Sequence, residues 1–192
     1  MRFVVLLGLL LLSSSPPLHA RELAGIDVPE IVRLHDDNDP LSLNGAGIRR
    51  TLFADVYVGA LYLPQPAQDL AGILRTPGAK RFSMHFIRSE IRPEKLVPVW
   101  NRGFEKNLSP EEFRALRPRI ANFNGLFPTL RKGDRVDIDM LPGIGTQVWI
   151  NDKLRGRVTG DDFARALLHI WLGEHPADTG LKRALLGGNN TQ

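Results

Sequence analysis

The sequence has no cysteine, and this absence argues against several classes of protein. The chain has no disulfide framework, no thiol nucleophile and no lipoprotein attachment site, so a hydrophobic core alone must stabilise it. The motifs His-Glu-x-x-His, Gly-x-Ser-x-Gly and Gly-x-x-x-x-Gly-Lys are also absent. Zinc proteases, serine hydrolases of the nucleophile-elbow type and phosphate-binding-loop proteins are therefore not indicated.

The chain also lacks an apolar run long enough for a stable membrane span. The run Phe3 to Leu12 is only about half of the roughly 20 residues that a spanning helix needs. Arg2 precedes it, a Ser/Pro-rich break follows it, and small Ala20 offers a cleavage point. This pattern predicts a signal peptide over residues 1–20 and a periplasmic or secreted protein.

Residues 21–192 contain no Gly/Ser-rich linker and no internal repeat, and their length predicts a single domain. The formal net charge is +4, with 25 Lys and Arg against 21 Asp and Glu. The basic residues are scattered rather than gathered in a stripe, so we do not expect nucleic acid to be a partner.

The pattern of apolar residues predicts strands, then helices, then strands, then helices. Strands are expected over 41–50, 51–63, 81–88, 134–140, 146–150 and 154–158, and helices over 67–74, from 93, from 110, over 161–172 and over 181–186. In the fourth strand, Asp137 and Asp139 alternate with apolar residues, which favours a solvated sheet face over an acid–base pair. The order of elements indicates an α+β fold, with an antiparallel sheet covered by a layer of helices.

Two short motifs mark where predicted helices and strands begin or end. Ser109, Pro110 and Glu112 form a capping box at a helix start. Asn151-Asp152 is typical of a tight hairpin turn, because both residue types tolerate the turn conformations.

Cofactor and metal sites are not predicted. Gly45-Ala46-Gly47 lacks the third glycine of a dinucleotide fingerprint and leads into β-type residues. His85, His169 and His175 have no carboxylate at a spacing that would support metal binding.

Several motifs resemble the chalcone isomerase-like family, and its secreted bacterial branch most closely. They are Leu43-Asn44-Gly45-Ala46-Gly47-Ile48-Arg49, then Val56 to Leu63, Gly133-Asp134, Asp162 to Leu168 and Trp171-Leu172-Gly173. The resemblance runs from about Val28 to Gly187. It implies an open-faced β-sandwich in which a large antiparallel sheet is layered with helices.

The family contains both isomerases and non-catalytic proteins that bind a ligand, so the resemblance leaves two functional classes to compare. Arg49 matches the cleft arginine of the family's enzymes, and Tyr57 replaces their threonine, as it does in fatty-acid-binding relatives. Arg92 and Val99 stand where the enzymes have a catalytic tyrosine and an asparagine. The resemblance thus favours a non-catalytic protein that binds a fatty acid or other apolar carboxylate through Arg49 and Tyr57, with Tyr62 and Arg92 as further ligand-binding candidates.

Arg49 and Tyr57 can bind one carboxylate together only if the chain turns between them. Eight residues of continuous strand would separate Arg49 from Tyr57 by roughly 26 Å. The chain must therefore reverse near Leu52 to Ala54, a segment with poor turn chemistry. Three alternatives stay open: Arg49 pairs with a surface carboxylate such as Asp55; the protein is an intramolecular lyase in which Arg49 stabilises an oxyanion; or it docks onto an envelope protein and binds no small ligand.

Overall fold

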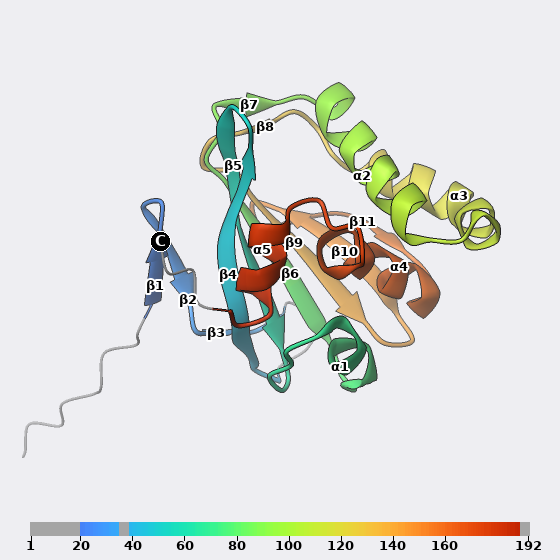
Figure 1. The fold of residues 1–192 in the computed structure, drawn as a ribbon, viewed down its shortest axis with the longest axis horizontal. Coiled ribbons are helices and arrows are strands. Elements are labelled where there is room, and N and C mark those ends of the chain that lie inside the picture. The colour runs from blue at the N-terminus through green and yellow to red at the C-terminus, as the bar shows by residue number, and fades with distance from the viewer. Residues whose placement is uncertain (1–19, 35–38, 189–192) are drawn as a thin grey trace, which may run out of the picture.

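A curled, seven-stranded antiparallel sheet organises the chain (Figure 1). The computed structural model describes residues 20–34 and 39–188, so the predicted signal peptide lies outside the described residues except for Ala20. The strand order is β11-β10-β9-β6-β5-β4-β3, and every neighbouring pair is antiparallel. The strands are β3 (Ile31–Val32), β4 (Leu41–Thr51), β5 (Ala54–Leu63), β6 (Lys80–Phe86), β9 (Arg135–Leu141), β10 (Gly145–Ile150) and β11 (Lys153–Val158).

Two short ladders stand apart from this sheet. The strands β1 (Ala20–Leu23) and β2 (Ile26–Pro29) form a hairpin. The residue pattern did not reveal this hairpin. The strands β7 (Glu90–Ile91) and β8 (Leu130–Arg131) pair beside the ends of β4 and β5 (Figure 1).

The helices gather on one face of the sheet, which confirms the predicted α+β architecture. They are α1 (Leu70–Arg75), α2 (Pro93–Asn107), α3 (Pro110–Asn124), α4 (Asp161–Leu172) and α5 (Thr179–Leu185). Helix α4 packs on β9 and β10, α5 packs on β4 and β5, and α2 lies on α4. Within residues 20–34 and 39–188, no helix is long and apolar enough to cross a membrane.

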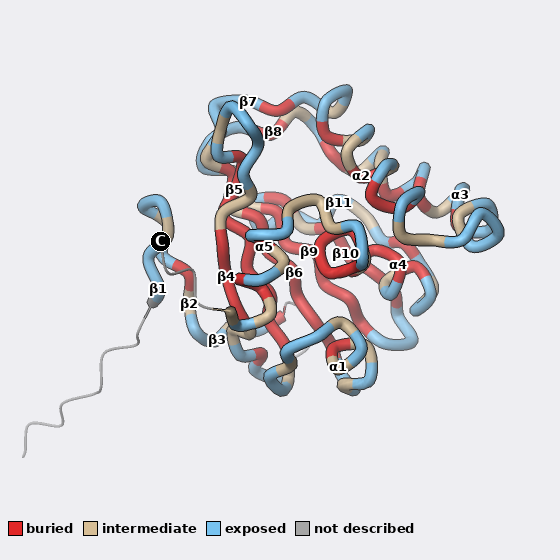
Figure 2. Tube along the Cα trace, in the orientation of Figure 1, coloured by how far each residue is buried: buried red, intermediate tan, exposed pale blue. Residues whose placement is uncertain are grey.

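The main core lies between the sheet and these helices. Phe82, Met84 and Phe86 alternate along β6 and are completely buried, as their spacing predicts (Figure 2). The ring of Phe82 lies 4.1 Å from that of Trp171 on α4, centroid to centroid. Aromatic contacts of this kind fasten the helix layer to the sheet.

The opposite face of the sheet corrects one expectation. Asp137 and Asp139 were expected on a solvated face, yet their exposed fractions are 2% and 1%. Their register explains this, because Arg81 and Ser83 of β6 stand directly across from them. Arg81 donates to both oxygens of Asp139 at 2.6 and 2.8 Å, and Ser83 donates to Asp137 at 2.5 Å. Carboxylates that are paired in this way can be buried, which an alternating pattern cannot reveal.

Both predicted local signals are present. The Ser109 side chain accepts from the Glu112 amide while the Glu112 side chain accepts from the Ser109 amide, which forms the capping box. Asn151 and Asp152 have φ angles of 50° and 61° and join β10 to β11. Positive φ at both turn residues matches the twist of the flanking strands.

Candidate functional site

The chain reverses between β4 and β5, as it must if Arg49 and Tyr57 are to lie close together. Arg49 of β4 stands directly across from Tyr57 of β5. The turn consists of Leu52 and Phe53, neither of which has a positive φ. Thr51 closes the turn instead: its hydroxyl donates to the Ala54 carbonyl at 3.0 Å and accepts from the Ala54 amide at 3.2 Å. A threonine side chain thus replaces the turn residues that the sequence lacks.

A β-bulge beside this turn orients the site. Arg50 pairs with Asp55 while Arg49 pairs with Tyr57, so β5 has one extra residue, Val56. The bulge lets Val56 and Tyr57 both join the core beneath the helices. Arg50 stays exposed and its side chain forms an ion pair with Asp55 at 3.3 Å.

Arg49 turns inward and pairs with a carboxylate. Its guanidinium lies 3.6 Å from Asp178, the residue that caps α5 by accepting from the Leu181 amide at 2.9 Å. Asp178 also accepts from the Arg50 amide at 2.9 Å. Asp178 therefore holds the end of β4 against α5. The same guanidinium nitrogen, Nη1, also donates to the Arg50 carbonyl at 2.5 Å. Because both contacts use Nη1, the donors of Nη2 and Nε can still reach a ligand.

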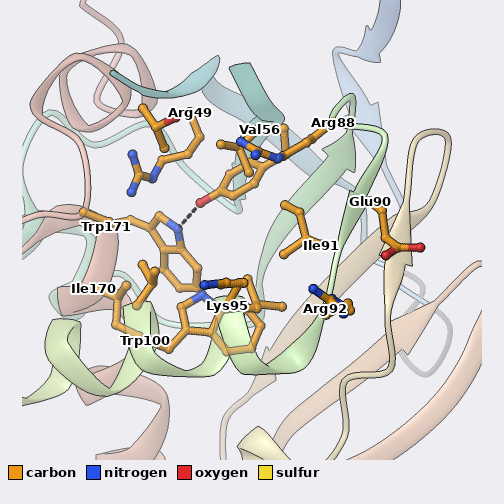
Figure 3. Close-up of a pocket in the computed structure, with 15 residues that line it drawn as sticks. Arg49, Val56, Arg88, Glu90, Ile91, Arg92, Lys95, Trp100, Ile170 and Trp171 are labelled. Carbon is orange, nitrogen blue, oxygen red and sulfur yellow. Dashed lines mark hydrogen bonds between the residues drawn. The ribbon is translucent and has the colours of Figure 1, made fainter. Parts of the chain in front are cut away.

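The side chains of Arg49 and Tyr57 line a cavity of about 410 Å³ between the β4–β5 hairpin, β7 and the helices α2 and α4 (Figure 3). This volume lies within the range of about 300 to 1,000 Å³ that is typical of small-molecule sites. Its wall is largely apolar, and its polar lining is dominated by cations. The lining consists of Arg49, Thr51, Val56, Tyr57, Arg88, Glu90, Ile91, Arg92, Lys95, Leu96, Val99, Trp100, Ile170, Trp171 and Ala177.

Tyr57 is held in place by the helix layer. The indole Nε1 of Trp171 donates to the Tyr57 hydroxyl oxygen at 2.9 Å, the hydrogen bond dashed in Figure 3. Burial raises the pKa of Tyr57 to about 12, against the opposing effect of nearby Arg49. The phenol is therefore protonated at neutral pH, so it has an O–H donor beside the Arg49 guanidinium.

The structure brings together three of the four predicted binding residues. Arg49, Tyr57 and Arg92 line the cavity, and so does Val99, the other position that the family resemblance singled out. Tyr62 does not lie there. It follows Tyr57 by five residues, so the alternation of the strand turns it to the opposite face of the sheet. There it is buried in a separate apolar cluster that includes Val28 and Leu41.

Sequence reasoning missed four residues at the site. Trp171 was recognised as part of a family motif but not as the partner of Tyr57, because a helical indole is more often ordinary core. Arg88 and Lys95 line the cavity from the segment that follows β6 and from α2. Asp178 caps α5 and pairs with Arg49, and that pairing depends on tertiary structure.

The described part of the chain holds no group of three or more His, Asp or Glu residues arranged to bind a metal ion. His85, His169 and His175 do not line the cavity. The polar groups that do line it are suited to an anion rather than to a cation.

The fold is that of a known family. The chain matches the model of the chalcone isomerase-like family over residues 20–187, and it belongs to that family. The crystal structure of a fatty-acid-binding protein of Arabidopsis thaliana is similar in fold, with a TM-score of 0.61. The two chains share 15% sequence identity over 84% of this chain and 92% of the plant protein. A search of curated proteins by sequence found no match.

Proposed function

We propose that this protein is an exported, non-catalytic member of its family that binds a fatty acid or other apolar carboxylate in the cavity described above. The observation that carries the proposal is the convergence of Arg49 and Tyr57 at an apolar cavity. A guanidinium offers a planar fork to two carboxylate oxygens, and the Tyr57 hydroxyl adds a third donor. The likeness to a plant fatty-acid-binding protein supports the same class of ligand.

The rest of the cavity suits an amphipathic anion. Four cationic side chains line it, those of Arg49, Arg88, Arg92 and Lys95, against the single carboxylate of Glu90. An acyl chain would lie against the apolar wall, where burial contributes about 0.8 kcal/mol for each methylene group. The cationic side chains would attract the carboxylate and favour its ionised form.

The test is a calorimetric titration with hexadecanoate. Arg49→Ala should weaken binding by about 10- to 100-fold, since a hydrogen bond to a charged group contributes about 1.5 to 3 kcal/mol. Arg50→Ala is the matched control, because Arg50 is the next residue but is exposed and paired with Asp55. Hexadecanol, which has the same chain without the charge, should bind more weakly than hexadecanoate. Unchanged affinity in the Arg49→Ala variant would refute the proposed clamp.

An intramolecular lyase acting on a chalcone-like enone is the second candidate, because Arg49 and protonated Tyr57 could also stabilise an oxyanion in this cavity. Loss of the long-wavelength absorbance of added chalcones, at a rate that depends on Arg49, would establish it. The absence of such a loss above background would count against this candidate.

Export is supported by the signal-peptide pattern of residues 1–20 and by the family match, which begins at residue 20. Amino-terminal sequencing of the protein recovered from cell fractions tests it. We expect the mature chain to begin at Arg21 in the periplasmic or secreted fraction. Recovery in the cytoplasm with Met1 intact would contradict export.

A further inference from the structure

The tip of the β4–β5 hairpin exposes two large apolar side chains. Leu52 and Phe53 have exposed fractions of 94% and 93%, whereas the next most exposed large apolar residue in the described ranges, Ile31, reaches 51%. Single exposed apolar residues are ordinary, but an adjacent pair at a projecting turn forms a contiguous apolar surface of the kind found at interaction sites. Neither residue serves the turn, which the Thr51 hydroxyl closes.

This tip adjoins the mouth of the cavity. Thr51, which precedes Leu52, lines the cavity, as do the exposed side chains of Arg88, Arg92 and Lys95. The amide of Arg88 donates to the carbonyl of Val56 at 3.1 Å, which holds this cation against the hairpin. Figure 1 shows the hairpin tip at the same end of the molecule as β7, β8 and the first turn of α2.

The surface around the tip is basic. Arg88, Arg92 and Lys95 are joined there by Lys132, whose amide donates to the Ser89 carbonyl at 3.2 Å. All four side chains are exposed, and none forms an ion pair within residues 20–34 and 39–188. We call these four residues the basic collar. Of the acidic groups of this region, Asp55 and Glu90 are paired with Arg50 and Arg131, and Glu94 in the first turn of α2 is exposed. The four cations of the collar therefore outnumber the one acidic group that is left beside them.

We propose that the Leu52–Phe53 tip and the basic collar dock this protein onto the surface of an anionic phospholipid bilayer. A projecting apolar pair surrounded by cations matches such a surface, which offers acyl chains beneath a layer of negative head groups. Phe53 and Leu52 enter the interface while the collar contacts phosphates. The cavity mouth then faces the lipid, so that a fatty acid passes between bilayer and cavity without crossing water. Only this last step rests on the proposed function.

Vesicle sedimentation tests the docking. The probes are vesicles of phosphatidylcholine alone and vesicles in which phosphatidylglycerol replaces about one third of it. The wild-type protein should bind the anionic vesicles more tightly, and high salt should weaken that binding. Leu52→Ser/Phe53→Ser should lower the affinity roughly tenfold or more. Lys132→Glu should lower it about fivefold or more, since each cation near the surface contributes about 1 kcal/mol.

Two control variants are matched in chemistry but lie elsewhere in the fold. Ile144→Ser replaces an apolar residue, 47% exposed, in the turn between β9 and β10, at the other end of the sheet. Lys106→Glu reverses an exposed charge in the last turn of α2. Both should bind anionic vesicles as the wild type does. Equal losses in the controls and in the tip variant, or failure of the wild-type protein to bind either vesicle, overturn the proposal and leave a protein partner as the ligand of the tip.

A second measurement separates docking from cargo binding. Leu52→Ser/Phe53→Ser should bind hexadecanoate from solution with unchanged affinity, because neither residue lines the cavity, while uptake from anionic vesicles slows. If the wild type binds vesicles but not hexadecanoate, docking stands and the proposed function fails. If it binds hexadecanoate but not vesicles, the reverse holds. Melting temperatures equal to that of the wild type confirm that the variants fold.

Discussion

The sheet carries two hairpin turns at the same end, near opposite edges, and they are built in different ways. The β10–β11 turn consists of Asn151 and Asp152, both with positive φ. The Asn151 side chain accepts from the Arg135 amide and donates to Asp134, each at 2.8 Å. The β4–β5 turn consists of Leu52 and Phe53, whose side chains are almost fully exposed.

The difference shows which turn is a structural element and which presents a surface. The residues of the β10–β11 turn are those that its backbone conformation needs, and their side chains are used within the fold. At the β4–β5 turn, Thr51 supplies the closing hydrogen bonds, so the two tip residues are free to be apolar. Residues that break the usual turn chemistry without a structural reason are expected to have a function instead.

The largest expected effect concerns the β10–β11 turn. Asn151→Val should lower the free energy of unfolding by about 3 kcal/mol. A β-branched residue at a positive φ costs about 1 to 2 kcal/mol, and two lost hydrogen bonds add about 1 kcal/mol or less each. Urea denaturation measures the change. Asn151→Gly is the control: it removes the same hydrogen bonds but tolerates the φ, so its loss should be smaller. Equal losses would show that backbone strain is not the cause.

The phenol that faces Arg49 should titrate far above its ordinary range. The sequence has only two tyrosines, so phenolate absorbance in the Tyr62→Phe variant reports Tyr57 alone. An unfolded tyrosine has a pKa near 10, whereas burial raises that of Tyr57 to about 12. The free energy of unfolding should therefore be insensitive to this group below pH 10 and should fall as the pH rises from about 10 to 12. A midpoint near 10 in the folded protein would be inconsistent with a buried Tyr57.

Most of the fold could be predicted from local signals. Alternation identified β6 and β9, and capping residues fixed the start of α3, because these features depend on neighbours in the sequence. The burial of Asp137 and Asp139 could not be predicted in this way. It depends on Arg81 and Ser83, which are more than fifty residues away and become neighbours only through the β6–β9 register.

The site was predictable in part, through family resemblance rather than residue pattern. Arg49, Tyr57 and Arg92 were found by motif, and the structure brings them to one cavity. The reversal at Leu52 depends on Thr51, a side chain that is not usually read as a turn signal. Tyr62 was misplaced because family motifs mark positions in a sequence, whereas the alternation of β5 decides which face a side chain reaches.

Removing the negative charge that pairs with Arg49 should have a smaller effect, in this case on ligand affinity. The polar side chains of the β10–β11 turn bond to Asp134 and Arg135 at the start of the neighbouring strand β9. Arg49 of the other hairpin instead pairs with Asp178 at the start of helix α5. Asp178→Asn keeps an acceptor for the Leu181 amide and removes the competing charge, so the affinity for hexadecanoate should rise by up to about fivefold. Asp55→Asn, which releases exposed Arg50 instead, should leave that affinity unchanged. Weaker binding in the Asp178→Asn variant would mean that Asp178 positions Arg49 for the ligand rather than competing with it.

The smallest expected effect on stability comes from replacing the apolar residues of the β4–β5 turn with residue types that favour a tight turn, as in the β10–β11 turn. Leu52→Asn/Phe53→Gly should change the free energy of unfolding by no more than about 0.5 kcal/mol, because both side chains are exposed and make no packing contacts that unfolding would break. The same variant should lose affinity for anionic vesicles. Chemical denaturation and vesicle sedimentation on one preparation compare the two effects. A loss of stability well above 1 kcal/mol would show that Leu52 and Phe53 support the hairpin itself, and the contrast between a structural turn and a functional one would then fail.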